Sequence, residues 1–136
     1  YIGLESGNEA LLKYLNKPST PDSIVHTVQA LKQGGVAVGI IVLLGAGGKK
    51  YALDHVCDTI KVINRLQLDA EDILYFSELV ESKGMEYQKK AYEESLQPLC
   101  EEERFAQGLQ IEKALKFSGS HGIPHIARYD IREFVY

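Results

Sequence analysis

An apolar run in the middle of the chain constrains the fold more than any other feature of the sequence. Residues 36–44 read VAVGIIVLL, which is rich in β-branched side chains and contains no charge. Apolar side chains at successive positions point to both faces of a strand, which predicts a strand of a parallel sheet or barrel. The run is too short for a membrane anchor, which needs about 20 residues.

Helix and strand patterns alternate on either side of this run. We expect a helix over 21–33, because Thr20 can cap it, Pro21 suits its first position and Gly34-Gly35 can end it. The other expected elements are a strand over 1–6, a helix capped by Asn8, a helix over 51–66, a strand over 72–80, helices over 86–96 and 101–117 divided near Pro98, and one or two short extended segments in 123–136.

This alternation predicts an α/β fold in which parallel strands are joined by right-handed crossovers. A complete (β/α) barrel takes about 250 residues, whereas the 136 residues here supply only some of its units. We therefore expect a parallel-strand partial (β/α) barrel fragment, or a small open sheet, in a single domain over 1–136. Barrel strands and helices would occupy 1–84, and a helical extension and tail 85–136. The chain begins with Tyr1 and no targeting segment, so we expect a piece of a longer protein.

Charge and cysteine content exclude several classes of protein. The net charge is -4 and no basic cluster is present, so a general electrostatic grip on nucleic acid is not expected. Cys57 and Cys100 lie far apart, which fits neither a disulfide-dense secreted scaffold nor a CxxC metal knuckle. The cysteine usage therefore predicts a reducing, cytoplasmic location and no metal site.

Three expected strand ends are candidate binding places, because ligands of α/β folds gather at the carboxyl ends of strands. The first is Glu5-Ser6-Gly7-Asn8, which is also a plausible strand-to-helix turn. The second, residues 45–50 (GAGGKK), could cradle a phosphate or form a plain turn, but it matches neither the P-loop nor the dinucleotide fingerprint. The third is residues 78–82, where exposed backbone could pair with a base edge.

Histidines and the second cysteine have simpler interpretations. His55 and Thr59 share a helix face, and we expect a structural pair in which Thr59 or a backbone carbonyl satisfies the imidazole. We predict that His121 and His125 are loop residues, because nearby glycine and proline rule out the helix that a zinc pair would need. Cys100 stands where a helix cap would stand, before an acidic first turn.

Taken in order and at their spacings, the three segments resemble the later half of the barrel in radical S-adenosylmethionine enzymes. Residues 3–8 (GLESGN) and the leucine-rich helix after them are similar to the fourth-strand segment of that superfamily. Residues 34–48 resemble its fifth strand and glycine loop, with His55 and Thr59 repeating the H-x-x-x-T of the next helix. Residues 72–81 resemble its sixth strand, whereas the tail, including 129–134, is only compatible with such proteins.

The resemblance implies a partial S-adenosylmethionine site. It places Glu5 and Ser6 near the ribose and methionine parts of the cofactor, the turn containing Gly45, Gly47 and Gly48 near adenosine, and the backbone of Leu79 and Val80 against adenine. The C-x-x-x-C-x-x-C loop that binds the [4Fe-4S] cluster is missing, as is the glycine-glycine-glutamate segment that meets the methionine amine. The cluster is therefore expected only in the full-length parent.

The resemblance predicts the C-terminal part of an iron-sulfur enzyme whose N-terminal half is the chain's partner. That parent would cleave the cofactor reductively and abstract hydrogen from a substrate, which the fragment alone would not do. One alternative is a small nucleotide- or phosphate-binding α/β module without redox chemistry, and another is a structural or interaction domain. We also expect self-association through the strand edge at residues 1–4.

Overall fold

The computed structural model describes residues 1–80, 85–117 and 121–129. Within these residues, one sheet has the strand order β1-β2-β3-β4, and each neighbouring pair is parallel. The strands are β1 (Ile2–Glu5), β2 (Gly39–Leu44), β3 (Ile73–Glu78) and β4 (His125–Tyr129). The helices are α1 (Glu9–Tyr14), α2 (Pro21–Gln33), α3 (Gly48–Arg65), α4 (Glu86–Glu93) and α5 (Glu101–Ala114).

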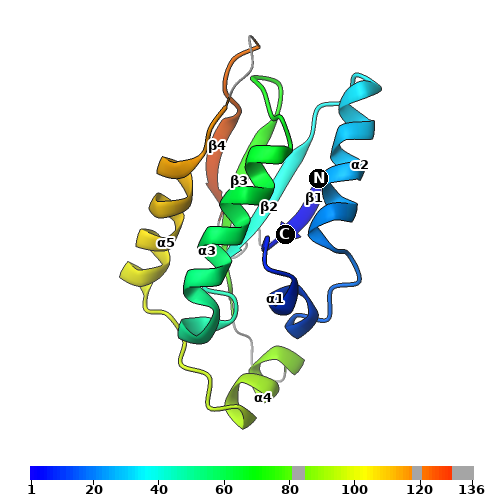
Figure 1. Cartoon of the computed structure of the whole chain (residues 1–136). Coiled ribbons are helices and arrows are strands. Elements are labelled where there is room, and N and C mark those ends of the chain that lie inside the picture. Colours follow the sequence, from blue (N-terminus) through cyan, green and yellow to red (C-terminus); the bar gives the residue numbers. More distant parts are fainter. Residues whose placement is uncertain (81–84, 118–120, 130–136) are drawn as a thin grey trace, which may run out of the picture.

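The larger helices α2, α3 and α5 cover the same face of the sheet, as Figure 1 shows. Each strand lies beside the next one in the chain, and each connection between strands contains one of these three helices. A doubly wound sheet reverses its strand order and places helices on both faces, whereas a (β/α) barrel keeps sequential order and one outer helical layer. The sheet is therefore an arc of parallel βα units, which confirms the predicted α/β class.

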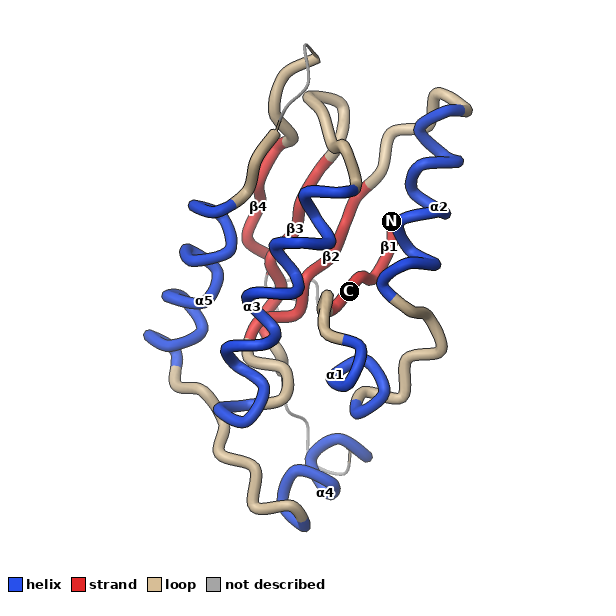
Figure 2. Tube along the Cα trace, viewed as in Figure 1, coloured by secondary structure: helices blue, strands red, loops and turns tan. Residues whose placement is uncertain are grey.

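The two faces of the sheet differ in their side chains. Alternate residues such as Leu4, Val42 and Phe76 point toward the helices and are almost fully buried, with Val28 of α2 and Ile111 of α5 in the same core. Residues of the opposite set are mostly only half-buried, as at positions 41, 43 and 75. Figure 2 shows the strands behind the helical layer, with α4 beyond one end of the sheet. The principal core thus lies between the sheet and the outer helices.

Local capping explains where several helices begin. Asn8 accepts a hydrogen bond from the Leu11 amide at the start of α1. Thr20 and Ser23 form a reciprocal capping box at the start of α2, with Pro21 in the first helical position. The bounds of α2 agree with the prediction from sequence. Cys100 is the N-cap residue of α5, as expected.

The central strand is shorter than the apolar run suggested. Strand β2 begins at Gly39, because the first residues of the run have other partners. The Val36 amide donates to the Leu31 carbonyl at the end of α2, and the Val38 amide donates to the Asp72 carboxylate. Hydrophobicity alone therefore placed the strand start three residues too early.

The C-terminal third contributes to both layers of the fold. Residues 85–136, expected as a helical extension and tail, supply α5 to the helical layer and β4 to the sheet. The prediction that His125 is a loop residue was wrong, because His125 opens β4 and pairs in register with Ile73. His121 lies in a turn, as expected. The end of the tail and residues 81–82 of the third candidate segment lie outside the described residues.

The Asp72 carboxylate links several segments at the amino-terminal end of the sheet. Asp72 is fully buried and accepts hydrogen bonds from the amides of Val38 and Asp69, at 2.9 Å each, and from the Lys32 ammonium. Burial by itself lowers the pKa of Lys32, but hydrogen bonds to Asp72 and Asp69 outweigh it and raise that pKa. The cluster joins α2, the start of β2 and the start of β3. The cluster lies at the amino ends of the strands, whereas ligands of such folds bind at the carboxyl ends. We therefore assign it a role in stability.

Among the described residues, no helix combines the length and apolar character that crossing a membrane requires.

Candidate functional site

The three candidate segments gather at one edge of the sheet. Because β1, β2 and β3 are parallel and adjacent, their carboxyl ends meet there. Glu5 pairs with Val42, Leu44 pairs with Glu78, and the Leu79 amide donates to the Leu44 carbonyl at 2.9 Å. The structure therefore brings together Glu5-Ser6, the 45–48 turn and the start of the segment after β3.

Glu5 presents a carboxylate at this edge in an unusual backbone conformation. Its φ is +58°, and the pairing of β1 with β2 shifts between Gly3 and Glu5. The side chain folds back along the strand, since a Cβ atom at Gly3 would lie 2.5 Å from Glu5 Oε1. Lys17 Nζ donates to the same oxygen at 2.9 Å, and the Glu5 side chain remains 14% exposed. A positive φ strains the backbone of a non-glycine residue, and such strained residues are commonly found at functional sites.

Ser6 lies behind this carboxylate rather than at the surface. Its side chain is 0% exposed, and its hydroxyl oxygen accepts a hydrogen bond from the Asn8 amide at 3.0 Å. Nδ1 of His55 lies 2.7 Å from the same oxygen. Because the hydroxyl is enclosed by these partners, Ser6 shapes the turn after β1 and does not present its side chain outward.

Helix α3 holds the following two residues of the turn as well. Thr59 Oγ1 accepts from the Gly7 amide, and Asp58 Oδ2 accepts from Asn8 Nδ2, both at 2.8 Å. The approach is so close that a Cβ atom at Gly7 would lie 2.3 Å from the Asp58 carbonyl oxygen. The turn that positions Glu5 is thus bound directly to the side chains and backbone of α3. The sequence spacing of α3 did not predict that Asp58 would bind the Asn8 side chain.

His55 is structural, as expected, although its nearest partner was not foreseen. Thr59 Oγ1 lies 3.4 Å from His55 Nδ1, whereas the Ser6 hydroxyl is at 2.7 Å. His55 Nε2 is buried with no hydrogen-bond partner among the described residues. Burial lowers the pKa of His55 from 6.5 to about 4, so the imidazole is neutral at pH 7.

Amides of the glycine turn are directed into the protein. The Gly45 amide donates to Gln107 Oε1 at 2.9 Å, and the Gly47 amide donates to the Tyr87 hydroxyl at 3.0 Å. The Gly48 amide donates to the Gly45 carbonyl, and the Lys49 amide donates to the Gln97 carbonyl. Anion sites at helix N-termini need amides that point at the ligand. These four amides already have acceptors within the chain.

Helix α5 also reaches the end of β3. Arg104 Nε donates to Glu78 Oε2 at 2.9 Å, and its Nη1 donates to the Leu99 carbonyl at 2.8 Å. The Arg104 side chain packs beside Gly45, where a Cβ atom would lie 2.7 Å from Arg104 Cδ. Leu79 and Val80 are half-buried next to this pair. Arg104 and Gln107 were not predicted, because they come from a helix about 60 residues after the turn that they support.

The described residues contain no group of three or more histidine, cysteine, aspartate or glutamate side chains arranged to hold a metal ion. Cys57 and Cys100 are both free and exposed. A hydrogen bond from the Glu103 backbone amide to the Cys100 thiol lowers the pKa of that thiol, but the side chains of Glu102 and Glu103 act in the opposite direction and the pKa is raised overall.

No protein-family model matches the chain, and no curated protein matches it either.

Proposed function

We propose that the chain is the C-terminal part of a radical S-adenosylmethionine enzyme and contributes part of the cofactor site. One observation carries the proposal. Glu5-Ser6, the 45–48 turn and Leu79-Val80 follow three adjacent parallel strands and meet at one sheet edge. The resemblance in sequence requires this order and this common edge. A sheet with interleaved strand order would have separated the segments.

The residues at the edge differ in how they suit the cofactor. The Glu5 carboxylate is part-exposed and can accept hydrogen bonds from ribose hydroxyls or an ammonium group. Leu79 and Val80 are half-buried residues, and their backbone suits the polar edge of adenine. Ser6 and the glycine turn support the site from behind, because their polar groups bond to α3, α4 and α5.

When bound, S-adenosylmethionine and a [4Fe-4S] cluster supply a 5'-deoxyadenosyl radical for hydrogen abstraction in the enzymes that the sequence resembles. This chain's own contribution is to bind and orient. Lys17 fixes one Glu5 oxygen at 2.9 Å, and α3 fixes the turn that follows Glu5. A carboxylate held on a rigid element places a bound hydroxyl or ammonium group reproducibly.

The missing cluster ligands give the most direct test. In this proposal the cluster and the remainder of the cofactor site belong to the N-terminal half of the same parent protein. The coding sequence before Tyr1 should then contain a C-x-x-x-C-x-x-C loop, and the full-length protein should bind four iron and four sulfide per chain. An upstream sequence without the three cysteines overturns the proposal.

Replacing Glu5 by Ala in the full-length protein should weaken S-adenosylmethionine binding by at least about tenfold, because a hydrogen bond to a charged group contributes about 1.5 to 3 kcal/mol. Ser6→Ala should also weaken binding, through the turn. Isothermal titration calorimetry measures both effects. Glu9→Ala is the matched control, since Glu9 is an exposed acid whose carboxylate pairs with Lys13 on the surface of α1.

Val25→Ala separates affinity from stability. Val25 is buried in the core, so its truncation should lower the melting temperature and leave cofactor affinity unchanged. If Glu5→Ala binds the cofactor as tightly as the wild type does, Glu5 is not part of the site.

A phosphate-binding module without redox chemistry remains the alternative. The geometry does not favour it, because the amides of Gly45, Gly47, Gly48 and Lys49 donate to acceptors within the chain.

Self-association is the expected behaviour of the isolated chain. Strand β1 is an edge strand in the described sheet, and an unpaired edge is a template for further pairing. The face opposite the helices also carries half-buried apolar residues such as Ile41 and Tyr75. Light scattering after size-exclusion chromatography should show a dimer or larger species, whose mass decreases on dilution. A monomer at all concentrations would show that these elements close their own core.

A further inference from the structure

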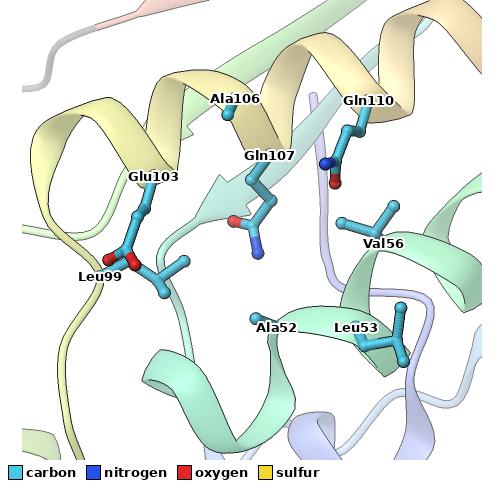
Figure 3. A pocket seen from close by; sticks show the side chains of 8 residues that line it. All are labelled: Ala52, Leu53, Val56, Leu99, Glu103, Ala106, Gln107 and Gln110. Atoms are coloured by element: carbon cyan, nitrogen blue, oxygen red, sulfur yellow. The ribbon is translucent and has the colours of Figure 1, made fainter.

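The helical layer contains a pocket of about 330 Å³ between α3 and α5. Figure 3 shows that its walls come from both helices and from Leu99, which lies in the loop just before α5. Most of the lining is apolar and includes Ala52, Leu53, Val56 and Ala106. The pocket lies in the outer layer, and the proposed cofactor site does not use it.

One polar group in this pocket has an unusual environment. Gln107 is only 4% exposed, and its Nε2 has no hydrogen-bond partner among the described residues. Rotating the Gln107 side-chain amide by 180° would break a hydrogen bond, because its Oε1 accepts from the Gly45 amide at 2.9 Å. Figure 3 shows Nε2 directed into the space between α5 and α3. A buried donor without an acceptor destabilises the folded chain, and a ligand that supplies the acceptor removes that cost.

We propose that this pocket binds a small neutral molecule with an apolar body and a carbonyl oxygen, which accepts a hydrogen bond from Gln107 Nε2. The volume is at the lower end of small-molecule sites, which span about 300 to 1,000 Å³. Since the Gly45 amide fixes the orientation of the Gln107 side chain, the pocket presents the Nε2 donor. A ligand must therefore supply a hydrogen-bond acceptor.

The charged group at the pocket determines the ligand's charge. Glu103 lines the pocket, and its carboxylate disfavours an anionic ligand there. It is already paired, because Oε2 accepts from the Cys100 amide at 2.9 Å and Oε1 lies 3.4 Å from Lys49 Nζ. Glu103 therefore does not need a ligand cation. A ketone, lactam or amide with a compact apolar body fits these constraints.

Titration of the ¹⁵N-labelled chain with cyclohexanone tests the proposal by NMR. We expect saturable shifts at the backbone amides of Ala52 and Val56 and at the side-chain amide of Gln107, all following one dissociation constant. Cyclohexanecarboxylate, which has the same ring and a negative charge, should bind at least about fivefold more weakly, a difference equivalent to about 1 kcal/mol. Shifts that rise linearly with cyclohexanone across the whole chain would overturn the proposal.

Two variants with a matched control locate the binding. Gln107→Glu, measured at pH 8, keeps an oxygen for the Gly45 amide but removes the donor, so cyclohexanone affinity should fall at least about fivefold. Ala106→Leu fills the pocket from an exposed position of α5 and should abolish the shifts in a folded chain. Gln33→Glu makes the same chemical change at an exposed position of α2, away from the lining of the pocket, and should bind like the wild type. Unchanged binding in both Gln107→Glu and Ala106→Leu would disprove the assignment.

Discussion

Replacing Asp72 by Asn is expected to lower the free energy of unfolding by about 3 kcal/mol, the largest loss that we predict for a single isosteric change. The carboxylate is fully buried and accepts from three donors, the amides of Val38 and Asp69 and the ammonium of Lys32. Asparagine can accept through one oxygen only, and its amide group would face a donor. The Lys32 side chain, which is 18% exposed, would lose its buried counter-charge.

Urea denaturation followed by circular dichroism measures this loss as a lower midpoint at unchanged slope. Asp22→Asn is the matched control, because Asp22 forms an exposed ion pair with Arg65 and such pairs contribute about 0 to 1 kcal/mol. Equal urea midpoints for the Asp72 and Asp22 variants would show that the buried carboxylate does not stabilise the fold.

The order of most elements could be predicted because each of them has a local cause. Helix α2 follows from Thr20, Pro21 and the glycines after it, all within a few residues of its ends. Strand β2 follows from β-branched apolar residues on both faces. These local patterns also implied parallel strands, since a helix between two strands provides the crossover connection that parallel pairing requires. The α/β class therefore needed no long-range information.

Element ends were less predictable where the backbone bonds to distant residues. The start of β2 depends on Asp72, which takes the Val38 amide from 34 positions away. Strand β4 was expected only as short extended segments, because the sequence of 125–129 has no strong apolar alternation. Its place in the sheet comes from pairing with β3. No local pattern carries either interaction.

The candidate site shows the same division between local and distant causes. Strand order was enough to predict that Glu5, the 45–48 turn and Leu79 share one edge. The partners that fix the site come from other elements: Gln107 on the glycine turn, and Asp58 on Asn8. A glutamine or aspartate on an amphipathic helix looks like an ordinary solvent-facing residue in sequence. Only the packing of α3 and α5 gives these side chains their roles.

Lowering the pH from 6.5 to 4 is expected to remove about 3 kcal/mol of stability through His55 alone. Burial lowers the pKa of His55 from 6.5 to about 4 in the folded chain. Between these values the unfolded chain binds a proton that the folded chain does not, so acidification favours unfolding. The loss should be absent above pH 6.5, should approach 1.4 kcal/mol per pH unit within the window, and should level off below pH 4.

Asp58 acts in a separate, more acidic range. Hydrogen bonds from Lys61 and Asn8 lower the pKa of Asp58 below 3.8, so its contribution is lost only as the pH falls further. Urea denaturation at half-unit steps from pH 8 to pH 4 therefore covers the pH range of the His55 effect, and a His55 variant identifies its share. His55→Asn keeps a polar group near the Ser6 hydroxyl and does not titrate, so its stability should change much less across this window. His26→Asn makes the same change at an exposed position of α2 and should keep the wild-type profile. A His55→Asn profile as steep as that of the wild type would mean that the buried imidazole is not the group that makes the fold acid-sensitive.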